Sequence, residues 1–296
     1  MNDIKTRLHQ AWKRKFARLF EADERETKTL SSPQGQALCQ VTYSKRLEQW
    51  YRSSVRKARY EKPECFFCEK HDEYALLETV TQFHHLGIYF NAKYVAPCHF
   101  LISPGSEHRE YPNERDVVAL SELAGCTGLS ILGNFRDSGA SYPRHVHYQS
   151  LGLEFPMAGT PEEEIFVSDS IRLARMDYPV VALCVCPRGT KGLKLAGVVV
   201  PKVPHPHNLL FYGDNIFIIP RAKSIPFNTK GFKFGAAEVC GHVFARTREM
   251  YEMMDYDLTL AALQDVCVPG RDKKAQECEN RFLEAIEEAT HEVQDT

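Results

Sequence analysis

Apolar residues recur at a spacing of four at the start of the chain: Leu8, Trp12, Phe16 and Phe20. This spacing places them on one face of a helix, so an amphipathic helix is predicted there. A Ser/Pro/Gly-rich break follows at residues 31–35, and a second polar helix is predicted around residues 43–60. Because Pro63 ends that pattern, residues 1–62 are expected to form an N-terminal helical segment.

The next part of the chain, residues 63–158, carries short apolar runs separated by turn residues such as Pro104-Gly105 and Ser138-Gly139. The runs predict strands at residues 86–91, 99–103, 130–135 and 145–151. Between the second and third strands, the apolar pattern of residues 114–128 predicts a helix that lies on the sheet.

The composition changes after Pro156, where an acidic segment at residues 161–164 opens a second part of the chain, residues 159–296. Strands are predicted there at residues 180–186, 195–200, 209–212 and 216–219, and helices at residues 236–254, 258–264 and 272–293. Strands mixed with helices in both parts predict an α+β fold, with the two parts sharing a sheet or core.

The overall charge limits the choice of partners. The chain has 296 residues, a formal net charge of −2 and 43% hydrophobic residues, which is typical of a globular protein without a general nucleic-acid or membrane affinity. The first residues lack the apolar stretch of a signal peptide, so a cytoplasmic, reducing location is expected. The ten cysteines are therefore expected to be thiols or metal ligands, with Cys184 and Cys186 as small buried side chains.

The strongest chemical pattern is His145-Val-His147-Tyr-Gln149, which follows the small-residue loop at residues 138–141. In an extended strand, these two imidazoles and the amide share one face. A neutral imidazole is a good nucleophile toward phosphorus, and backbone amides of a small-residue loop can approach a phosphate. A chance exposed strand pattern and a pair of metal ligands remain alternatives.

A second pattern is Cys65-Phe-Phe-Cys68. Two thiolates at this spacing can bind one tetrahedral Zn²⁺ together with two imidazoles, for which His84, His85, His99 and His108 are candidates. The alternative is a pair of buried cysteines in a Phe-rich turn.

Residues 88–149 resemble the nucleotide-binding half of the histidine-triad superfamily, and the galactose-1-phosphate uridylyltransferase branch fits best. The motifs occur in that family's order: Cys65-x-x-Cys68, Phe90-Asn91, Ser103-Pro-Gly-Ser-Glu-His108, a helix, Asn134, and His145-x-His147-x-Gln149. The resemblance implies a histidine-triad-like antiparallel sheet with flanking helices and two related halves.

The resemblance also implies roles for single residues. It assigns His147 as the nucleophile and Gln149 as the residue that holds the α-phosphate. It assigns structural zinc ligation to Cys65, Cys68, His108 and His145. It assigns phosphate contacts to Asn134 and Ser141, and a contact with the ribose or base to Asn91.

The second part of the chain is similar to GDP-hexose phosphorylases and diadenosine tetraphosphate phosphorylases at residues 206–210, 216–221 and 237–244. Arg144, Arg221 and Lys223 are candidates to hold an anionic substrate, and solvated charges are the alternative. His205 and His207 are interpreted as loop residues, with a second metal or phosphate contact as the alternative.

Taken together, the resemblance implies a nucleotidyltransferase or phosphorylase that works through a nucleotidyl-histidine intermediate. Its substrate would be a nucleoside diphosphate sugar or a dinucleotide, and its acceptor phosphate or a sugar phosphate. Relatives with glutamine at the position of Gln149 are typically transferases. A hydrolase of nucleotidyl conjugates and a non-catalytic zinc-stabilised nucleotide-binding protein remain alternatives. Relatives are often dimers, so a homodimer is among the expectations.

Overall fold

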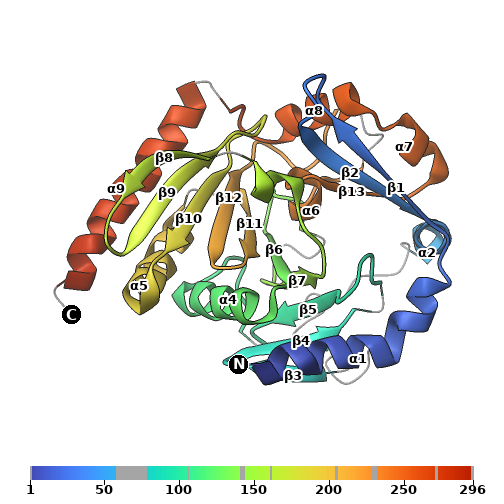
Figure 1. Ribbon diagram of the computed structural model, residues 1–296, viewed down its shortest axis with the longest axis horizontal. Coiled ribbons are helices and arrows are strands. Elements are labelled where there is room, and N and C mark those ends of the chain that lie inside the picture. The colour runs from blue at the N-terminus through green and yellow to red at the C-terminus, as the bar shows by residue number, and fades with distance from the viewer. Residues whose placement is uncertain are drawn as a thin grey trace.

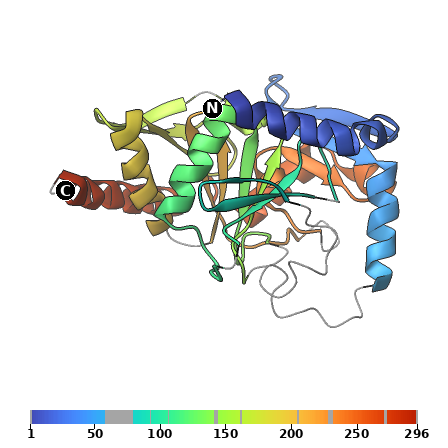
Figure 2. The ribbon, with the colours of Figure 1, turned by 90° about the horizontal axis from the view of Figure 1, so that it is seen from below.

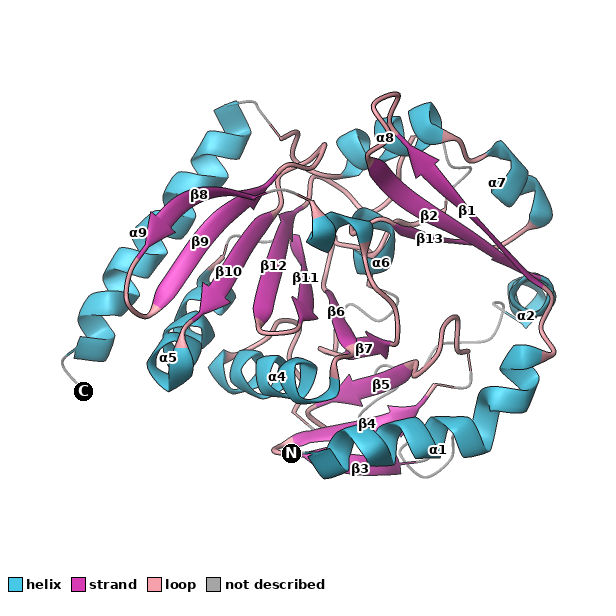
Figure 3. Cartoon of the chain, viewed as in Figure 1, coloured by secondary structure: helices cyan, strands magenta, loops and turns pink. Residues whose placement is uncertain are grey.

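A computed structural model describes residues 2–57, 79–91, 93–105, 107–140, 144–160, 162–203, 206–227, 232–270 and 273–294. In this part of the chain, one large and one small sheet are flanked by helices (Figures 1 and 3). The large sheet has ten strands, and all of its strand pairs are antiparallel. The predicted α+β class with an antiparallel sheet and flanking helices is confirmed.

The large sheet contains strands from both parts of the chain, in the order β3-β4-β5-β7-β6-β11-β12-β10-β9-β8. Its strands are β3 (Thr79–Phe83), β4 (Leu86–Phe90), β5 (Phe100–Ser103), β6 (Ser130–Asn134), β7 (Tyr148–Leu151), β8 (Glu162–Val167), β9 (Ile171–Met176), β10 (Leu183–Pro187), β11 (His207–Tyr212) and β12 (Asn215–Pro220). The pairing of β6 with β11, which places Leu132 opposite Leu210, joins the two parts into one sheet.

The small sheet corrects the prediction for the N-terminal segment. Strands β1 (Arg25–Ser31) and β2 (Ala37–Ser44) form a hairpin, and β13 (His242–Ala245) pairs with β2 in parallel. The second helix, α2 (Lys45–Lys57), begins only after β2. The sequence pattern missed the hairpin because β1 is mostly polar and exposed, so it shows little hydrophobic alternation.

The helices surround the sheets, and most of them match the predicted positions. They are α1 (Asn2–Glu21), α4 (Glu114–Thr127), α5 (Gly189–Val199), α6 (Ala236–Val239), α7 (Arg248–Met253), α8 (Tyr256–Val266) and α9 (Lys273–Gln294), with short 3₁₀ turns at Pro156–Gly159 and Val200–Lys202. The predicted helix at residues 236–254 is wrong, because β13 lies between α6 and α7.

The strand predicted at residues 195–200 is also wrong, since helix α5 occupies it. Its apolar run is buried on nearly every side, so the pattern does not distinguish a helix from a strand. Gly197 lies directly against α4, where an added Cβ would be 3.0 Å from side-chain atoms of Glu114 and Val118. Figure 2 shows α4 and α5 side by side.

The large sheet is buried on both faces. Leu209 and Phe211 of β11 belong to the core under α1, α4, α5 and α9. The intervening Leu210 belongs to a second core, which is shared with the small sheet and α8. None of the helices described is long and apolar enough to cross a membrane.

Candidate active site

The segment with the two histidines does not continue the strand, which corrects the strand predicted at residues 145–151. Strand β7 begins at Tyr148, so His145 and His147 lie in the turn before it. The Val146 N–H donates to the carbonyl of Arg109 at 2.6 Å, a residue outside the sheet. Of the three polar residues of the motif, only Gln149 therefore has its position set by the strand ladder.

His147 is held in one tautomer by its own backbone. Its Nδ1 lies 3.0 Å from the carbonyl oxygen of His145, and because that oxygen can only accept, Nδ1 carries the proton. The lone pair of a neutral ring is then on Nε2. The side chain is buried, and this burial lowers its pKa below the usual value, so the ring stays neutral. The arrangement suits a nucleophile.

Gln149 is held by a buried imidazole that the sequence pattern indicates only as a possible zinc ligand. The Val95 N–H donates to Nδ1 of His99 at 3.1 Å, so the proton of His99 is on Nε2. His99 hydrogen-bonds the side chain of Gln149. Nδ2 of Asn91 lies 2.8 Å from Nε2, and since both nitrogens carry protons in this tautomer, this contact is not a hydrogen bond. Burial lowers the pKa of His99 to about 3, so the ring is neutral.

This geometry places two predicted substrate contacts, Asn91 and Gln149, on one imidazole. With Nε2 of His99 as donor, the oxygen of the Gln149 amide is the acceptor, and its NH₂ group is left to donate elsewhere. The sequence signal that could have identified His99 is its position directly before β5, which pairs with β7 through Leu101 and Gln149.

The predicted zinc set is only half within the described residues. The rings of His108 and His145 lie next to each other, with centroids 5.6 Å apart, and Nε2 of His145 is 3.2 Å from Oγ of Ser103. Cys65 and Cys68 lie outside the described residues. Within the described part of the chain, no group of three or more possible ligands comes together.

The other histidines weighed as zinc partners have different contacts. His84 contacts Glu122, and His85 contacts Asp116, each at 2.7 Å. His99 is hydrogen-bonded to Val95. Of the four histidines considered as zinc ligands, His108 is therefore the one whose ring lies next to that of His145.

The turn of residues 135–140 corrects another expectation. The amides of residues 138–141 were expected to approach a phosphate, but the N–H groups of Ser138 and Ala140 donate to the carbonyl of Phe135, at 3.1 and 3.4 Å. The N–H of Gly139 donates to Oγ of Ser224 at 3.2 Å. The amides of Ser138, Gly139 and Ala140 are therefore engaged within the protein, and Ser141 lies outside the described residues.

Asn134 joins the site to the second part of the chain. Its Oδ1 accepts from the Ala236 N–H at 2.6 Å and from Nδ2 of Asn208 at 3.1 Å. Because both bonds use the oxygen, they orient the side chain with its NH₂ group as the remaining donor.

Arg221 lies behind this site and uses all five of its donors within the protein. Its nitrogens donate to Oδ1 of Asn208 and to backbone carbonyls of Ser138, Lys223, Phe234 and Val266. The guanidinium is buried, and burial lowers its pKa. A direct contact with substrate would break one of these bonds, so its placement fits a structural role.

The remaining charged and histidine candidates lie apart from these contacts. Arg144 is exposed beside His145, and Lys223 pairs with Asp265 at 2.7 Å. His207 is buried on β11 against Phe135, and His205 lies outside the described residues.

A buried carboxylate supports the histidine segment from the opposite face of β7. The hydroxyl of Tyr148 donates to Asp116 at 2.8 Å, and Arg109 forms an ion pair with the same carboxylate. Since the carbonyl of Arg109 also accepts from Val146, the helix α4 that carries Asp116 fixes the turn before β7. The sequence pattern gave no indication of this network.

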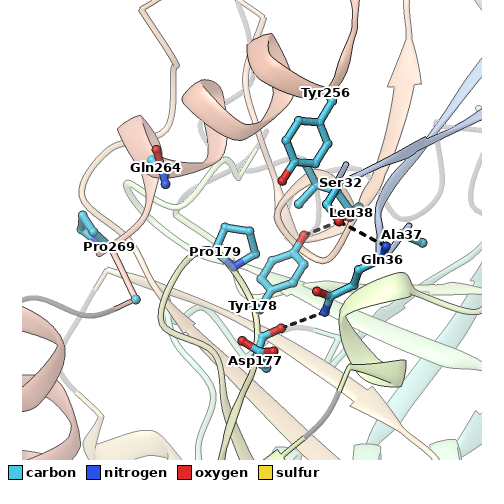
Figure 4. Close-up of a pocket in the computed structure, with 11 residues that line it drawn as sticks. Ser32, Gln36, Ala37, Leu38, Asp177, Tyr178, Pro179, Tyr256, Gln264 and Pro269 are labelled. Carbon is cyan, nitrogen blue, oxygen red and sulfur yellow. Dashed lines mark hydrogen bonds between the residues drawn. The ribbon is translucent and has the colours of Figure 1, made fainter. Parts of the chain in front are cut away.

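A cavity of about 450 Å³ lies elsewhere, between the β1–β2 turn, the β9–β10 connection and α8 (Figure 4). Tyr178 and Tyr256 contribute to its walls, and Gln36 donates to the backbone carbonyl of Asp177 at 3.3 Å. None of the predicted site residues lines it.

Comparison with solved structures gives one consistent result. The fold is similar to that of yeast Ap4A phosphorylase Apa2 in complex with Ap4A, with a TM-score of 0.62 and 16% sequence identity over 90% of this chain and 98% of that chain. Apa2 in complex with AMP gives a TM-score of 0.61 and 15% identity, over 89% of this chain and 97% of that chain.

The likeness therefore extends over nearly the whole of both chains and shows a shared fold. Comparisons with protein-family models and with curated protein sequences find no match.

Proposed function

We propose that this protein is a nucleotidyltransferase of the phosphorylase type, which transfers a nucleoside monophosphate group through a covalent adduct on His147. The observation that carries the proposal is the bond between Nδ1 of His147 and the His145 carbonyl, which leaves the lone pair on Nε2. The likeness in fold to Ap4A phosphorylase supports a dinucleoside polyphosphate as substrate, ahead of a nucleoside diphosphate sugar.

The reaction would take two displacement steps at the α-phosphorus. Nε2 of His147 attacks, the N–P bond forms, and the bond to the leaving phosphate oxygen breaks. An oxygen of inorganic phosphate or a sugar phosphate then attacks the same phosphorus, and the N–P bond breaks. The covalent adduct divides one difficult displacement into two easier ones.

The side-chain amides of Gln149 and Asn134 would bind the oxygens on which negative charge gathers. The NH₂ groups of Gln149 and Asn134 are oriented for this by bonds that their oxygens accept. Neutral donors stabilise the charge that develops in the transition state without attracting a counter-ion in the ground state. Ser141 and Arg144 remain proposed phosphate contacts.

The adduct is tested by incubating the protein with Ap4A labelled in its α-phosphate. Label should remain on the protein, resist base and be released by acid, as expected of a phosphoramidate. Replacement of His147 by alanine should abolish labelling, while the matched control His84→Ala should label normally because His84 is exposed and bound to Glu122. Undiminished labelling of His147→Ala would refute the mechanism.

The acceptor is tested by measuring how fast a preloaded adduct decays. Phosphate should accelerate decay well beyond the rate in buffer, and acceleration by hexose 1-phosphate alone would instead indicate a uridylyltransferase-like enzyme. Equal decay in buffer, phosphate and sugar phosphate would identify a hydrolase and overturn the proposal.

Zinc is proposed as a structural ion bound by Cys65, Cys68, His108 and His145. The adjacent rings of His108 and His145 fit half of a Cys₂His₂ set, in which two thiolates balance the charge of the ion. Protein purified without added metal should contain about one zinc per chain. Cys65→Ser should lower the melting temperature, since metal binding contributes folding free energy. A metal-free preparation with an unchanged melting temperature would rule the site out.

A further inference from the structure

Arg246 directly follows β13, on which His242 and Phe244 share one face. The rings of these two residues are stacked with centroids 4.6 Å apart, and Nε2 of His242 lies 3.1 Å from Oγ1 of Thr42 on β2. The opposite face of the small sheet packs on α7, where Tyr43 meets Tyr251. His242 and Phe244 therefore lie on the face of the small sheet that is turned away from α7.

The guanidinium of Arg246 is held by ring faces and not by carboxylates. Its central carbon lies 4.5 Å from the ring centroid of Phe232 and 5.2 Å from that of Tyr51 on α2. No ion pair or hydrogen bond of Arg246 is found within the described part of the chain. Contacts through the ring faces leave the N–H groups at the edge of the guanidinium able to bind an oxyanion.

Arg248, two residues further on, has a carboxylate partner, unlike Arg246. It forms an ion pair with Glu26, in which Nη1 lies 2.7 Å from a carboxylate oxygen, and its guanidinium lies 4.2 Å from the ring centroid of Tyr43. The two arginines thus share a strand end and a mode of ring contact, but only Arg248 has a carboxylate partner among the described residues.

Short contacts connect Arg246 to the turn of residues 135–140, which directly follows Asn134. The Phe232 ring lies 5.9 Å from that of Phe234. A Cβ added to Gly139 would be only 2.5 Å from the carbonyl of Phe234, so this segment lies directly on the turn of residues 135–140. Arg246 therefore contacts Phe232, and Phe232 contacts Phe234, which packs on that turn.

Two further groups, His242 and Glu238, add to this picture. Nδ1 of His242 is buried and has no hydrogen-bond partner among the described atoms. Glu238 interacts electrostatically with both Arg246 and Arg221, yet its carboxylate accepts from the Gly235 N–H at 2.8 Å, and no ion pair joins it to either arginine among the described residues. The positive charge of Arg246 is thus not neutralised by a direct carboxylate contact within this part of the chain.

We propose that Arg246 binds a phosphate oxyanion beyond the α-phosphate of the substrate, with Phe232 and Tyr51 holding its guanidinium in place. The ligand class is the polyphosphate chain of a dinucleoside polyphosphate, or the inorganic phosphate that replaces it. This inference rests on the proposed function for the identity of the substrate, but the oxyanion subsite itself does not require a nucleoside.

The test compares three probes by calorimetry with the full chain and the variants Arg246→Gln and Arg246→Lys, with Arg248→Gln as the matched control. Ap4A carries distal phosphates, AMP carries only the α-phosphate, and tripolyphosphate carries no nucleoside. Arg246→Gln should weaken binding of Ap4A and tripolyphosphate about 10- to 100-fold, the effect expected for a charge-assisted hydrogen bond. Binding of AMP should change less than about twofold.

Arg246→Lys should recover only part of the loss, because an ammonium keeps the charge but not the planar fork. Arg248→Gln should bind all three probes as the unaltered protein does. Equal weakening of AMP and Ap4A by Arg246→Gln, or no weakening of either, overturns the inference. If the unaltered protein binds tripolyphosphate through Arg246 but binds neither nucleotide, the proposed function fails while the oxyanion subsite stands. Binding of no probe at all refutes both.

Discussion

At the scale of single residues, chemistry at this site depends on which nitrogen of each imidazole carries the proton. A backbone carbonyl fixes the proton of His147 on Nδ1, and a backbone N–H fixes the proton of His99 on Nε2. One ring therefore offers a lone pair, and the other offers a donor to Gln149. His99 is accordingly a positioning residue that acts through the amide of Gln149.

A double-mutant cycle tests this role of His99. His99→Phe removes both ring nitrogens, and we expect a loss of turnover close to that of Gln149→Ala, roughly 10²-fold for one misplaced transition-state donor. In the Gln149→Ala background, His99→Phe should cost little more, because the two residues act as one unit. The measurement is the single-turnover rate of adduct formation in all four proteins.

His99→Gln is the conservative control, since a glutamine can accept from Val95 and donate to Gln149; it should restore part of the rate. Fully additive losses in the cycle, with no rescue by glutamine, would show that His99 supports the fold and does not position Gln149.

At the scale of elements, the site depends on the close approach of the turn at residues 135–140 to the segment before α6. Gly139 has a φ of +95°, and its Cα faces backbone atoms of Phe234 and Gly235. A side chain at this position would push the two segments apart. It would thereby break the hydrogen bond from the Ala236 N–H to Asn134 and the one from Arg221 to the Phe234 carbonyl.

Substitution of Gly139 by alanine should therefore destabilise the protein more than an equivalent change elsewhere. Gly213 is the matched control, with a φ of +57° and no atom within 4 Å of the position that a Cβ would occupy. Gly213→Ala should lower the free energy of unfolding by about 1–2 kcal/mol for the left-handed backbone alone. Gly139→Ala should lower it by about 3 kcal/mol or more, because a backbone clash is added. Urea denaturation measures both, and equal losses would contradict the close approach.

The element scale also explains which predictions were wrong. β1 is polar, and the second half of α5, from Leu195 to Val199, is apolar throughout, so neither shows the periodicity that identifies a strand or a helix. The turn at His145 and His147 was predicted as a strand because the alternation of residues 145–151 extends beyond the start of β7. In that turn, the bond from Val146 to Arg109 replaces a sheet bond, and no local pattern indicates it.

At the scale of the whole molecule, residues from both parts of the chain contribute to one site region. His147, Gln149 and Asn134 come from the first part, while Asn208 and Arg221, which hydrogen-bond Asn134 and Ser138, come from the second. The continuous sheet through β6 and β11 fixes the two parts relative to each other. Protonation of the buried histidines of such a fold lowers its free energy of unfolding.

The stability of the protein should therefore fall in mild acid. Burial lowers the pKa of His99 to about 3 and that of His242 to about 4, below the value of about 6.5 in an unfolded chain. The unfolded chain thus takes up protons first as the pH falls, so stability is full above about pH 6.5 and is lost progressively toward about pH 4 and below. Denaturant unfolding at a series of pH values should show this slope.

His242→Gln should flatten the slope between about pH 6.5 and pH 4. A slope that is the same in the His242 variant and in the unaltered protein would show that this imidazole is not the cause.

Local patterns in the chain were enough to predict the α+β class and the strands around the motif, while the resemblance to a known superfamily supplied the roles expected of the motif residues. Short apolar runs specify β4, β5, β6, β11 and β12, because each needs only a local pattern to bury its side chains. The motif His145-x-His147-x-Gln149 needs only local spacing, so it too can be identified from the chain alone.

How these residues are used became visible only in three dimensions. The tautomer of His147, the bond of His99 to Gln149 and the engagement of every donor of Arg221 depend on how the chain folds around each side chain. The difference between Arg246 and Arg248 also appears only in three dimensions, because Glu26 forms an ion pair with Arg248. Hydrogen bonds and charges act over a few ångströms in space, and separation along the chain does not reveal which groups come within that range.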